Sequence, residues 1–300
     1  ADAELGEFFR VALGGRYEES KQKTETSVTV IPDSRQLFPT LQEDFFLPAV
    51  TVTWIPTGNF QLRAGYSETL TRPQFRELTA VRFSDPDIDL SYIGNPFLEN
   101  SSIKNYDARA EWYFGRGEFA TIGVFYKDLE KPIEDVVRTS GNDTYISFLN
   151  APSAELFGAE VEFEKNFPLD EVLGDAWYGT DLVFKTNYTW SDSQVSNDGD
   201  VTIANVSGQG TAAAIVDAIN FIDDGSAMVG QSEHLFNLQF GLADADSGFQ
   251  GTFLVNYASD RILYRGEGTG SGPLPSVYED VPLTFDLVIN QELDLFGIGA

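Results

Sequence analysis

Ionisable side chains recur at every second position in several segments of this sequence. Asp107, Arg109 and Glu111 alternate in one segment, and Glu160 and Glu162 alternate in another. Two carboxyl groups on one face of a strand could act as the acid and base of a hydrolase. No other catalytic signal accompanies them, so we interpret these charges as the polar face of a β-sheet.

The sequence favours neither a metal site nor a cofactor site. The chain has no Cys, which excludes disulfides and thiolate ligands, and its single His, His234, cannot supply a zinc site alone. The Gly-Gln-Ser run at 230–232 lacks the second glycine of a nucleophile elbow. The glycines within 266–270 precede no helix of the kind that binds phosphate. We therefore expect no enzymatic activity and no cofactor.

The segments that carry the charges are predicted β-strands with two unlike faces. Successive side chains of a strand point to opposite sides. In residues 105–114, one face is apolar and the other polar: Tyr106, Ala108, Ala110, Trp112 and Phe114 against Asn105, Asp107, Arg109, Glu111 and Tyr113. A soluble sandwich would bury the apolar face, whereas a membrane barrel turns it to lipid and turns the charged face to a wet lumen.

About ten long strands are predicted, with a few shorter elements between them. The long strands span 8–17, 46–54, 60–70, 105–114, 119–129, 155–167, 178–190, 234–242, 249–257 and 283–293. Minor strands are expected at 133–138 and 145–149, and residues 24–31 are expected to extend the first strand pair. Apolar spacing in 211–222 predicts a short amphipathic helix.

The connections between the strands alternate between long and short. The long ones span 71–101, 130–153, 191–230 and 260–280, and the short ones lie near 55–59, 115–117, 168–176 and 243–248. Outer-membrane barrels sort their loops in this way, with short periplasmic turns and long external loops. We therefore predict an all-β fold, a transmembrane antiparallel up-and-down β-barrel with long extracellular loops. No segment approaches the roughly 20 apolar residues of a membrane helix.

The charge and the aromatic content of the chain limit the classes of partner and fold. The 300 residues carry a formal net charge of −28, so phosphate repulsion argues against a nucleic-acid partner. The loop at 191–230 contains six Asp and no Lys or Arg, which we interpret as a solvated acidic loop. Aromatic residues make up 13% of the chain, which suits the interfacial girdles of a membrane barrel and equally the core of a sandwich.

An ordered series of motifs runs through most of the chain. It reads RAGYSETLTRPQFREL at 63–78, GNPFL at 94–98, YD at 106–107, EWYF at 111–114, GVFYKD at 123–128, GAEVE at 158–162 and GQSEH at 230–234. The series resembles the C-terminal half of TonB-dependent outer-membrane receptors. One departure is Asn100, where the family often has Pro after a Leu.

The resemblance implies the architecture and partners of a longer protein. Residues 1–300 would be one barrel segment, about ten strands of roughly 22, with the plug, the early strands and the last strands missing. The implied location is the bacterial outer membrane, in contact with lipid and lipopolysaccharide. The implied partners are the plug domain of the same full-length chain, the TonB energy-coupling complex and a small nutrient ligand.

Two groups of candidate functional residues follow from this interpretation. Inward-facing charges would line the lumen and contact its water and the plug: Arg63, Asp107, Arg109, Glu111, Glu160, Glu162, Glu164 and Lys185. Aromatic residues of the outer loops would stack on substrate, or alternatively pack the loops together: Phe83, Tyr92, Phe97, Tyr145, Phe221 and Tyr264. Stacking rings would suit sugars or aromatic chelates.

The expected function is uptake of a scarce nutrient into the periplasm. The resemblance leaves a siderophore, cobalamin, an oligosaccharide and a peptide open as the substrate. The alternatives are a passive porin, a soluble β-sandwich that serves as a binding or adhesion module, and an outer-membrane enzyme that uses a luminal carboxylate. The direction in which the apolar face points distinguishes the soluble module from the membrane proteins.

Overall fold

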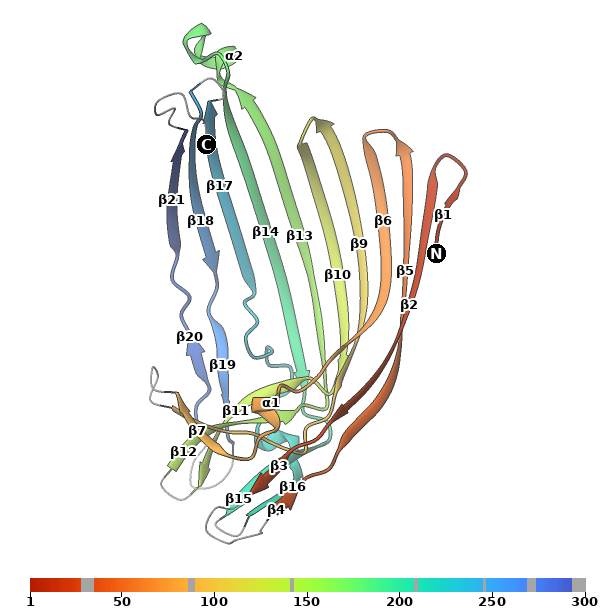
Figure 1. Cartoon of the computed structure of the whole chain (residues 1–300), viewed down its shortest axis with the longest axis vertical. Helices are drawn as coiled ribbons and strands as arrows, with labels where there is room; N and C mark the ends of the chain where they lie inside the picture. The colour runs from red at the N-terminus through yellow and green to blue at the C-terminus, as the bar shows by residue number, and fades with distance from the viewer. Residues whose placement is uncertain are drawn as a thin grey trace.

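The computed structural model describes residues 1–27, 35–85, 90–140, 143–207, 210–244, 247–268 and 274–292. Two β-sheets dominate it, one of eleven strands and one of six (Figure 1). Among the described residues, no helix has the length and apolar character needed to cross a membrane.

The large sheet is an antiparallel meander. Its strands, in spatial order, are β1 (Asp2–Leu5), β2 (Phe9–Gln22), β5 (Leu41–Thr57), β6 (Phe60–Thr71), β9 (Ser101–Gly115), β10 (Glu118–Glu130), β13 (Ser153–Pro168), β14 (Thr180–Ser196), β17 (His234–Asp244), β18 (Phe249–Ala258) and β21 (Thr284–Gln291). Each strand pairs with the strands that precede and follow it in the meander, as an up-and-down barrel requires. Within the described residues, β1 and β21 each have one neighbour, so the sheet is not closed.

The two ends of the large sheet differ in their connections. At the end drawn at the top of Figure 1, short turns join β1 to β2, β5 to β6, and β9 to β10. Gly117 in the β9–β10 turn has φ 74°, a left-handed conformation that glycine adopts without steric cost. The β13–β14 turn is longer and holds α2 (Leu169–Leu173) and η1 (Asp175–Trp177).

The long connections at the other end fold into a second unit, which we name the loop cap. It contains β3 (Glu25–Ser27), β4 (Arg35–Leu37), α1 (Phe75–Leu78), β7 (Arg82–Asp85), β8 (Leu90–Ile93), β11 (Ile133–Ser140), β12 (Asp143–Asn150), β15 (Asp200–Ser207), β16 (Gly210–Asp217), η2 (Ala218–Asn220), β19 (Arg261–Gly266) and β20 (Val277–Glu279). Its six-stranded sheet has the order β20-β19-β11-β12-β8-β7. The β11–β19 and β12–β8 pairs are parallel and join different connections.

The loop cap packs around two hydrophobic clusters, one of which it shares with the adjoining ends of β10, β13 and β14. One cluster includes Val136, Leu149 and Val201, and a second includes Leu78, Ile146, Phe148 and other residues that come from three connections. Leu149 and Val136 are completely buried. The cap is therefore a packed unit rather than a set of independent loops.

The structure changes several of the sequence-based expectations. The predicted helix at 211–222 is wrong, because those residues form β16 and the 3₁₀ turn η2. β16 pairs with β15 along its whole length, and Val216 packs against a cap cluster while Ile215 is 72% exposed. Strand pairing has overridden the helical spacing, since it satisfies the backbone hydrogen bonds of both segments.

Other differences add elements to the prediction. The short strand β1 at the sheet edge is not among the predicted strands. The predicted loop at 71–101 contains α1, β7 and β8, and the predicted loop at 260–280 contains β19 and β20. Within 24–31, Glu25–Ser27 forms β3, which pairs with β4, and residues 28–31 lie outside the described residues. The ten predicted long strands are otherwise present, with ends that shift by a few residues.

Candidate functional site

The register of the large sheet separates its side chains into an apolar face and a polar face. Ala64 pairs with Ala108, Ala108 with Val124, and Val124 with Ala159, so this row crosses four strands on the apolar face. Val124 is 55% exposed and Trp112 is 50% exposed. The apolar face is therefore not covered by protein in the described part of the chain.

Aromatic side chains form two bands across the apolar face. The band near the loop cap contains Tyr66, Tyr106, Tyr126, Phe157, Tyr188 and Trp190. The band near the short turns contains Phe9, Trp54, Trp112, Phe114, Phe163, Phe184, Phe240, Phe253 and Phe285. Contacts run along both bands, with ring centroids 5.0 Å apart for Tyr66 and Tyr106 and 5.3 Å for Phe184 and Phe240.

The region between the two bands is aliphatic. Along β9, Tyr106 and Trp112 are separated by roughly 20 Å, at about 3.3 Å per residue, with Ala108 and Ala110 between them. A transmembrane barrel has an outward apolar band of about 25 Å with an aromatic girdle at each interface. The pattern on the apolar face matches that arrangement.

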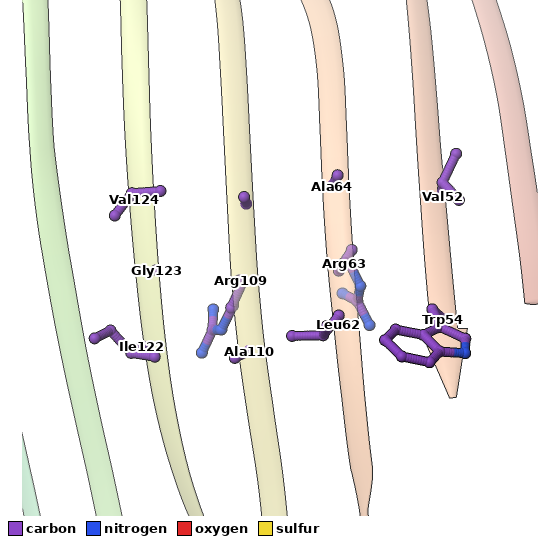
Figure 2. Close-up of a pocket in the computed structure, with 11 residues that line it drawn as sticks. Val52, Trp54, Leu62, Arg63, Ala64, Arg109, Ala110, Ile122, Gly123 and Val124 are labelled. Carbon is purple, nitrogen blue, oxygen red and sulfur yellow. The ribbon is translucent and has the colours of Figure 1, made fainter. Parts of the chain in front are cut away.

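A shallow hollow lies on the aliphatic band (Figure 2). Its volume is about 460 Å³, and small residues such as Ala64 and Ala110 form its floor between larger ones such as Trp54 and Ile122. The neighbouring Arg63 and Arg109 are drawn with it, but their pairing register assigns both to the opposite face. The lining of the hollow is mainly apolar, like the rest of the aliphatic band.

The polar face is organised around Glu111, which is 4% exposed. Its Oε1 atom lies 3.6 Å from Arg109 Nε and 3.8 Å from Arg63 Nη1. Its Oε2 atom accepts a hydrogen bond of 2.6 Å from the Tyr113 hydroxyl and one from the Gln61 amide. Arg63 and Arg109 are directly opposite in the register, an unfavourable pairing of like charges that the shared carboxylate offsets.

The polar network continues across the neighbouring strands. Arg109 Nη2 donates to Glu162 Oε2 at 2.8 Å and to Thr121 Oγ1 at 3.2 Å. Lys185 Nζ lies 2.9 Å from Glu164 Oε1. Arg109 therefore connects β9 to β10 and β13, and a second ion pair joins β13 to β14.

Two predicted lumen residues lie beside this network. Asp107 is exposed and leans over Gly65, where an added Cβ would come within 2.5 Å of its Oδ2 atom. Glu160 is half-buried, pairs in the register with Gly123 and Thr189, and has no ion-pair partner among the described residues. All the charged residues selected from the sequence share one face, and their role as the lining of a lumen stays a prediction.

The loop aromatics pack mainly inside the cap. Four of the six are at least 93% buried: Tyr92, Tyr145, Phe221 and Tyr264. The Tyr92 and Tyr264 hydroxyls are 2.8 Å apart, and the Tyr92 ring stacks on Phe83 with centroids 5.5 Å apart. Phe83 and Phe97 are half-buried. These contacts are of the kind expected if the aromatic residues pack the loops together. Contact of any of these six aromatic side chains with substrate stays a prediction.

Sequence reasoning did not single out some of the best-connected polar residues. Gln61 and Tyr113 bind Glu111 directly, and each lies two positions from a selected residue, so the strand period could have identified them. The buried pair of Glu134 and Arg265 in the cap joins residues 131 positions apart, a relation that no local pattern contains.

Metal-binding geometry is missing from the described segments. No group of three or more His, Asp or Glu side chains there could hold a metal ion. His234 accepts or donates at Nδ1 with the Tyr188 hydroxyl, 2.9 Å away, and its Nε2 lies 3.8 Å from Glu233 Oε1. The single histidine is therefore part of the rim of the apolar face near the cap.

Two solved structures with the same architecture belong to much longer chains. The siderophore receptor PiuA from Acinetobacter baumannii is 13% identical, with a TM-score of 0.56 over 93% of this chain and 34% of that chain. The FrpB iron transporter from Neisseria meningitidis is 11% identical, with a TM-score of 0.55 over 97% of this chain and 37% of that chain. The chain thus spans about a third of the length of these two proteins.

Sequence comparison gives the family. No curated protein sequence matches the chain. The family described as TonB dependent receptor-like, beta-barrel matches residues 3–287, which is nearly the whole chain. Together with the antiparallel meander, this match shows that the chain belongs to the TonB-dependent receptor β-barrel family.

Proposed function

We propose that the protein to which this chain belongs is an outer-membrane transporter that takes up a scarce nutrient into the periplasm. The observation that carries the proposal is the two-faced sheet: an uncovered aliphatic band between two aromatic bands on one side, and an ion-paired polar network on the other. Lipid would contact the first face, and a water-filled lumen would contact the second.

The polar face also supports a role for the plug domain. Network residues such as Arg63 and Arg109 have side chains 43% and 40% exposed, so their remaining hydrogen-bond donors are accessible. Arginine donors of this kind suit the carboxylates and backbone carbonyls of a domain inside the lumen. Movement of that domain by the TonB energy-coupling complex would open the path through the barrel.

The nutrient classes proposed for this protein are a siderophore, cobalamin and an oligosaccharide. The two solved structures named above are a siderophore receptor and an iron transporter, so we place an iron–siderophore complex first. Of the six predicted loop aromatics, Phe83 and Phe97 are half-buried, so a ligand could reach their rings. A stacking contact there would suit an aromatic chelate.

Uptake by whole cells tests the proposal. A strain that lacks the gene and a complemented strain are compared for accumulation of labelled ferric siderophores, cobalamin and oligosaccharides, with and without a protonophore. We expect one class to accumulate only in the complemented strain and only with an intact proton gradient. Phe83→Ala should raise the KM for that nutrient, whereas Val172→Ala at the opposite end of the barrel should not.

The alternatives give different results in the same experiments. A passive porin would admit its solutes whether or not the gradient is collapsed. A soluble binding or adhesion module would stay in solution without detergent and would not fractionate with outer membranes. An outer-membrane enzyme would turn over a substrate in a manner that depends on a carboxylate such as Glu160.

A further inference from the structure

Two adjacent carboxylates of β11 in the loop cap differ in their burial and in their partners. Glu134 is 1% exposed, lies 2.7 Å from Arg265 Nε, and accepts a hydrogen bond of 3.1 Å from the Val229 backbone N–H. Asp135 is half-buried and has neither an ion pair nor a hydrogen bond with any described residue. The strand therefore pairs one buried charge with an arginine and leaves the next one unpaired.

The side chain of Asp135 belongs to the apolar side of β11. Successive strand residues alternate, so Asp135 shares its side with Ile133 and Val137. Both neighbours pack into the cluster that holds Leu78 of α1, and the register partner of Asp135 is the buried Phe148. A carboxyl group stands in this row where an apolar side chain would continue the cluster.

α1 docks on β11 through this cluster and on the segment that follows β8 through backbone contacts. Leu78 is 3% exposed, and the N–H groups of Gly94 and Asn95 donate to the carbonyls of Thr79 and Glu77 at 3.0 and 2.6 Å. A Cβ on Gly94 would come within 2.6 Å of the α1 backbone, so the two segments are in close contact. Loss of these contacts would release α1 from the segment that follows β8 and from the apolar side of β11.

The charged and titratable groups near Asp135 come from every packed element. α1 contributes Arg76 and Glu77, β11 contributes Glu134, β8 contributes Tyr92 and β19 contributes Tyr264. The Arg76 guanidinium stacks over the rings of Phe83 and Tyr92 at 5.9 and 5.3 Å instead of pairing with Asp135. The Glu77 carboxylate of α1, which accepts a hydrogen bond of 2.9 Å from the Gln74 backbone N–H, adds a second negative charge near Asp135.

From this geometry we propose that Asp135 is a proton-dependent latch, which holds α1 on β11 when it is protonated and weakens this docking when it is ionised. Ionisation places a charge in an apolar row and near the Glu77 carboxylate, and detachment of α1 relieves both effects. Control of access to the barrel mouth by this latch rests on the proposed transport function, whereas the proton dependence of the docking does not.

The direction of the pH effect follows from the shift of the carboxyl group. Burial, with the Glu77 and Glu134 carboxylates, raises the pKa of Asp135 to about 7, and Arg76 opposes the shift. A group whose pKa is higher when docked binds more protons in the docked state, so docking weakens as pH rises from the undocked pKa toward 7. Between pH 6 and pH 8 the opening equilibrium should increase about tenfold.

Hydrogen–deuterium exchange of the whole protein in nanodiscs tests the latch. Protection factors, corrected for intrinsic exchange, are measured for the amides of Leu78, Gly94 and Asn95 across this pH range. In the native protein we expect their protection to fall about tenfold. In Asp135→Asn, which cannot ionise, we expect protection that is independent of pH.

Two further variants make the experiment decisive. Asp143→Asn removes an exposed carboxylate that lies 3.5 Å from Arg82 of β7, so it should change protection by the same factor at every pH and keep the native slope. Glu77→Gln removes the neighbouring charge and should reduce the pH slope, which supplies a result even if Asp135→Asn does not fold. Native protection that is flat with pH, a slope retained in Asp135→Asn, or an unchanged slope in Glu77→Gln would overturn the latch, whatever the uptake assays give.

Discussion

The large sheet and the loop cap use the same alternating strands and place their apolar side chains in opposite surroundings. Ile122 and Val124 of the large sheet are 56% and 55% exposed, whereas Val136 and Leu149 of the cap are completely buried. A cap strand packs its apolar side against other protein, and a strand of the large sheet leaves its apolar side uncovered. Alternation therefore identifies the apolar face of a strand but does not identify what covers it.

The treatment of charge differs between the two regions as well. The large sheet gathers its charges on one face, where Arg109 and Glu162 are both more than one-third exposed in their side chains. The cap contains the nearly inaccessible pair of Glu134 and Arg265. Exposed pairs are worth little because water solvates the separated charges, whereas a broken buried pair leaves an unsolvated charge. The predictions below test this contrast, from the largest expected effect to the smallest.

Removal of the buried arginine should have the largest effect. Arg265→Ala leaves Glu134 buried without its cation, which should destabilise the cap by about 3–5 kcal/mol. Proteolysis and amide exchange across β11 and β19 would measure the loss. Lys131→Ala removes an exposed pair with Glu99 and should cost no more than about 1 kcal/mol. Equal effects of the two substitutions would remove the contrast between buried and exposed ion pairs.

Truncation of apolar side chains should separate the regions in the same way. Leu149→Ala creates a cavity in the cap core and should cost about 2–5 kcal/mol. Val124→Ala should change stability by less than about 1 kcal/mol, because lipid or detergent refills the exposed site. Denaturation of the protein in micelles, followed by amide exchange in each region, measures the loss of stability in both variants. A large loss in Val124→Ala would mean that protein covers this face.

A charge added to each face of the large sheet tests which one meets lipid. Val161→Arg places a cation on the aliphatic band, where it should cost about 2–4 kcal/mol in a bilayer. Thr189→Arg places the same charge on the polar face opposite Glu160 and should be tolerated. The folded fraction after insertion into liposomes, read from heat modifiability, is the measurement. The reverse ranking would contradict the orientation proposed for the sheet.

The ion pairs of the polar face should have the smallest effect. A double-mutant cycle of Arg109→Ala and Glu162→Ala should give a coupling of about 0.2–1 kcal/mol, because both side chains contact water. High salt should reduce this coupling further by screening. A coupling of several kcal/mol that resists salt would show that the polar face is dry.

The face assignments of the large sheet could be predicted from the sequence because they depend on a local property. The strand period of two assigns Arg63, Arg109 and Glu162 to one face without knowledge of their partners. The ion pairs themselves required the register between strands, which sets Glu111 within reach of two arginines. The predicted helix at 211–222 failed because its partner strand, β15, was not expected.

The cap aromatics show a second limit of sequence reasoning. Tyr92 and Tyr264 were selected as loop residues accessible to substrate, yet their hydroxyls meet inside the cap across 172 positions of sequence. Burial of a loop residue depends on which other loops pack on it. Local composition does not contain that information, so a substrate role for these side chains stays a prediction.

By itself, the sequence determined the long strands, their two faces and the alternation of long and short connections. These features follow from backbone pleating and from turn chemistry, which act over a few residues. Only the tertiary structure decided that the long connections form one packed cap, that β11 pairs in parallel with β19, and that Asp135 lies in an apolar row. Such pairings depend on contacts between segments far apart in the chain, where several partners satisfy the same local pattern and packing selects one.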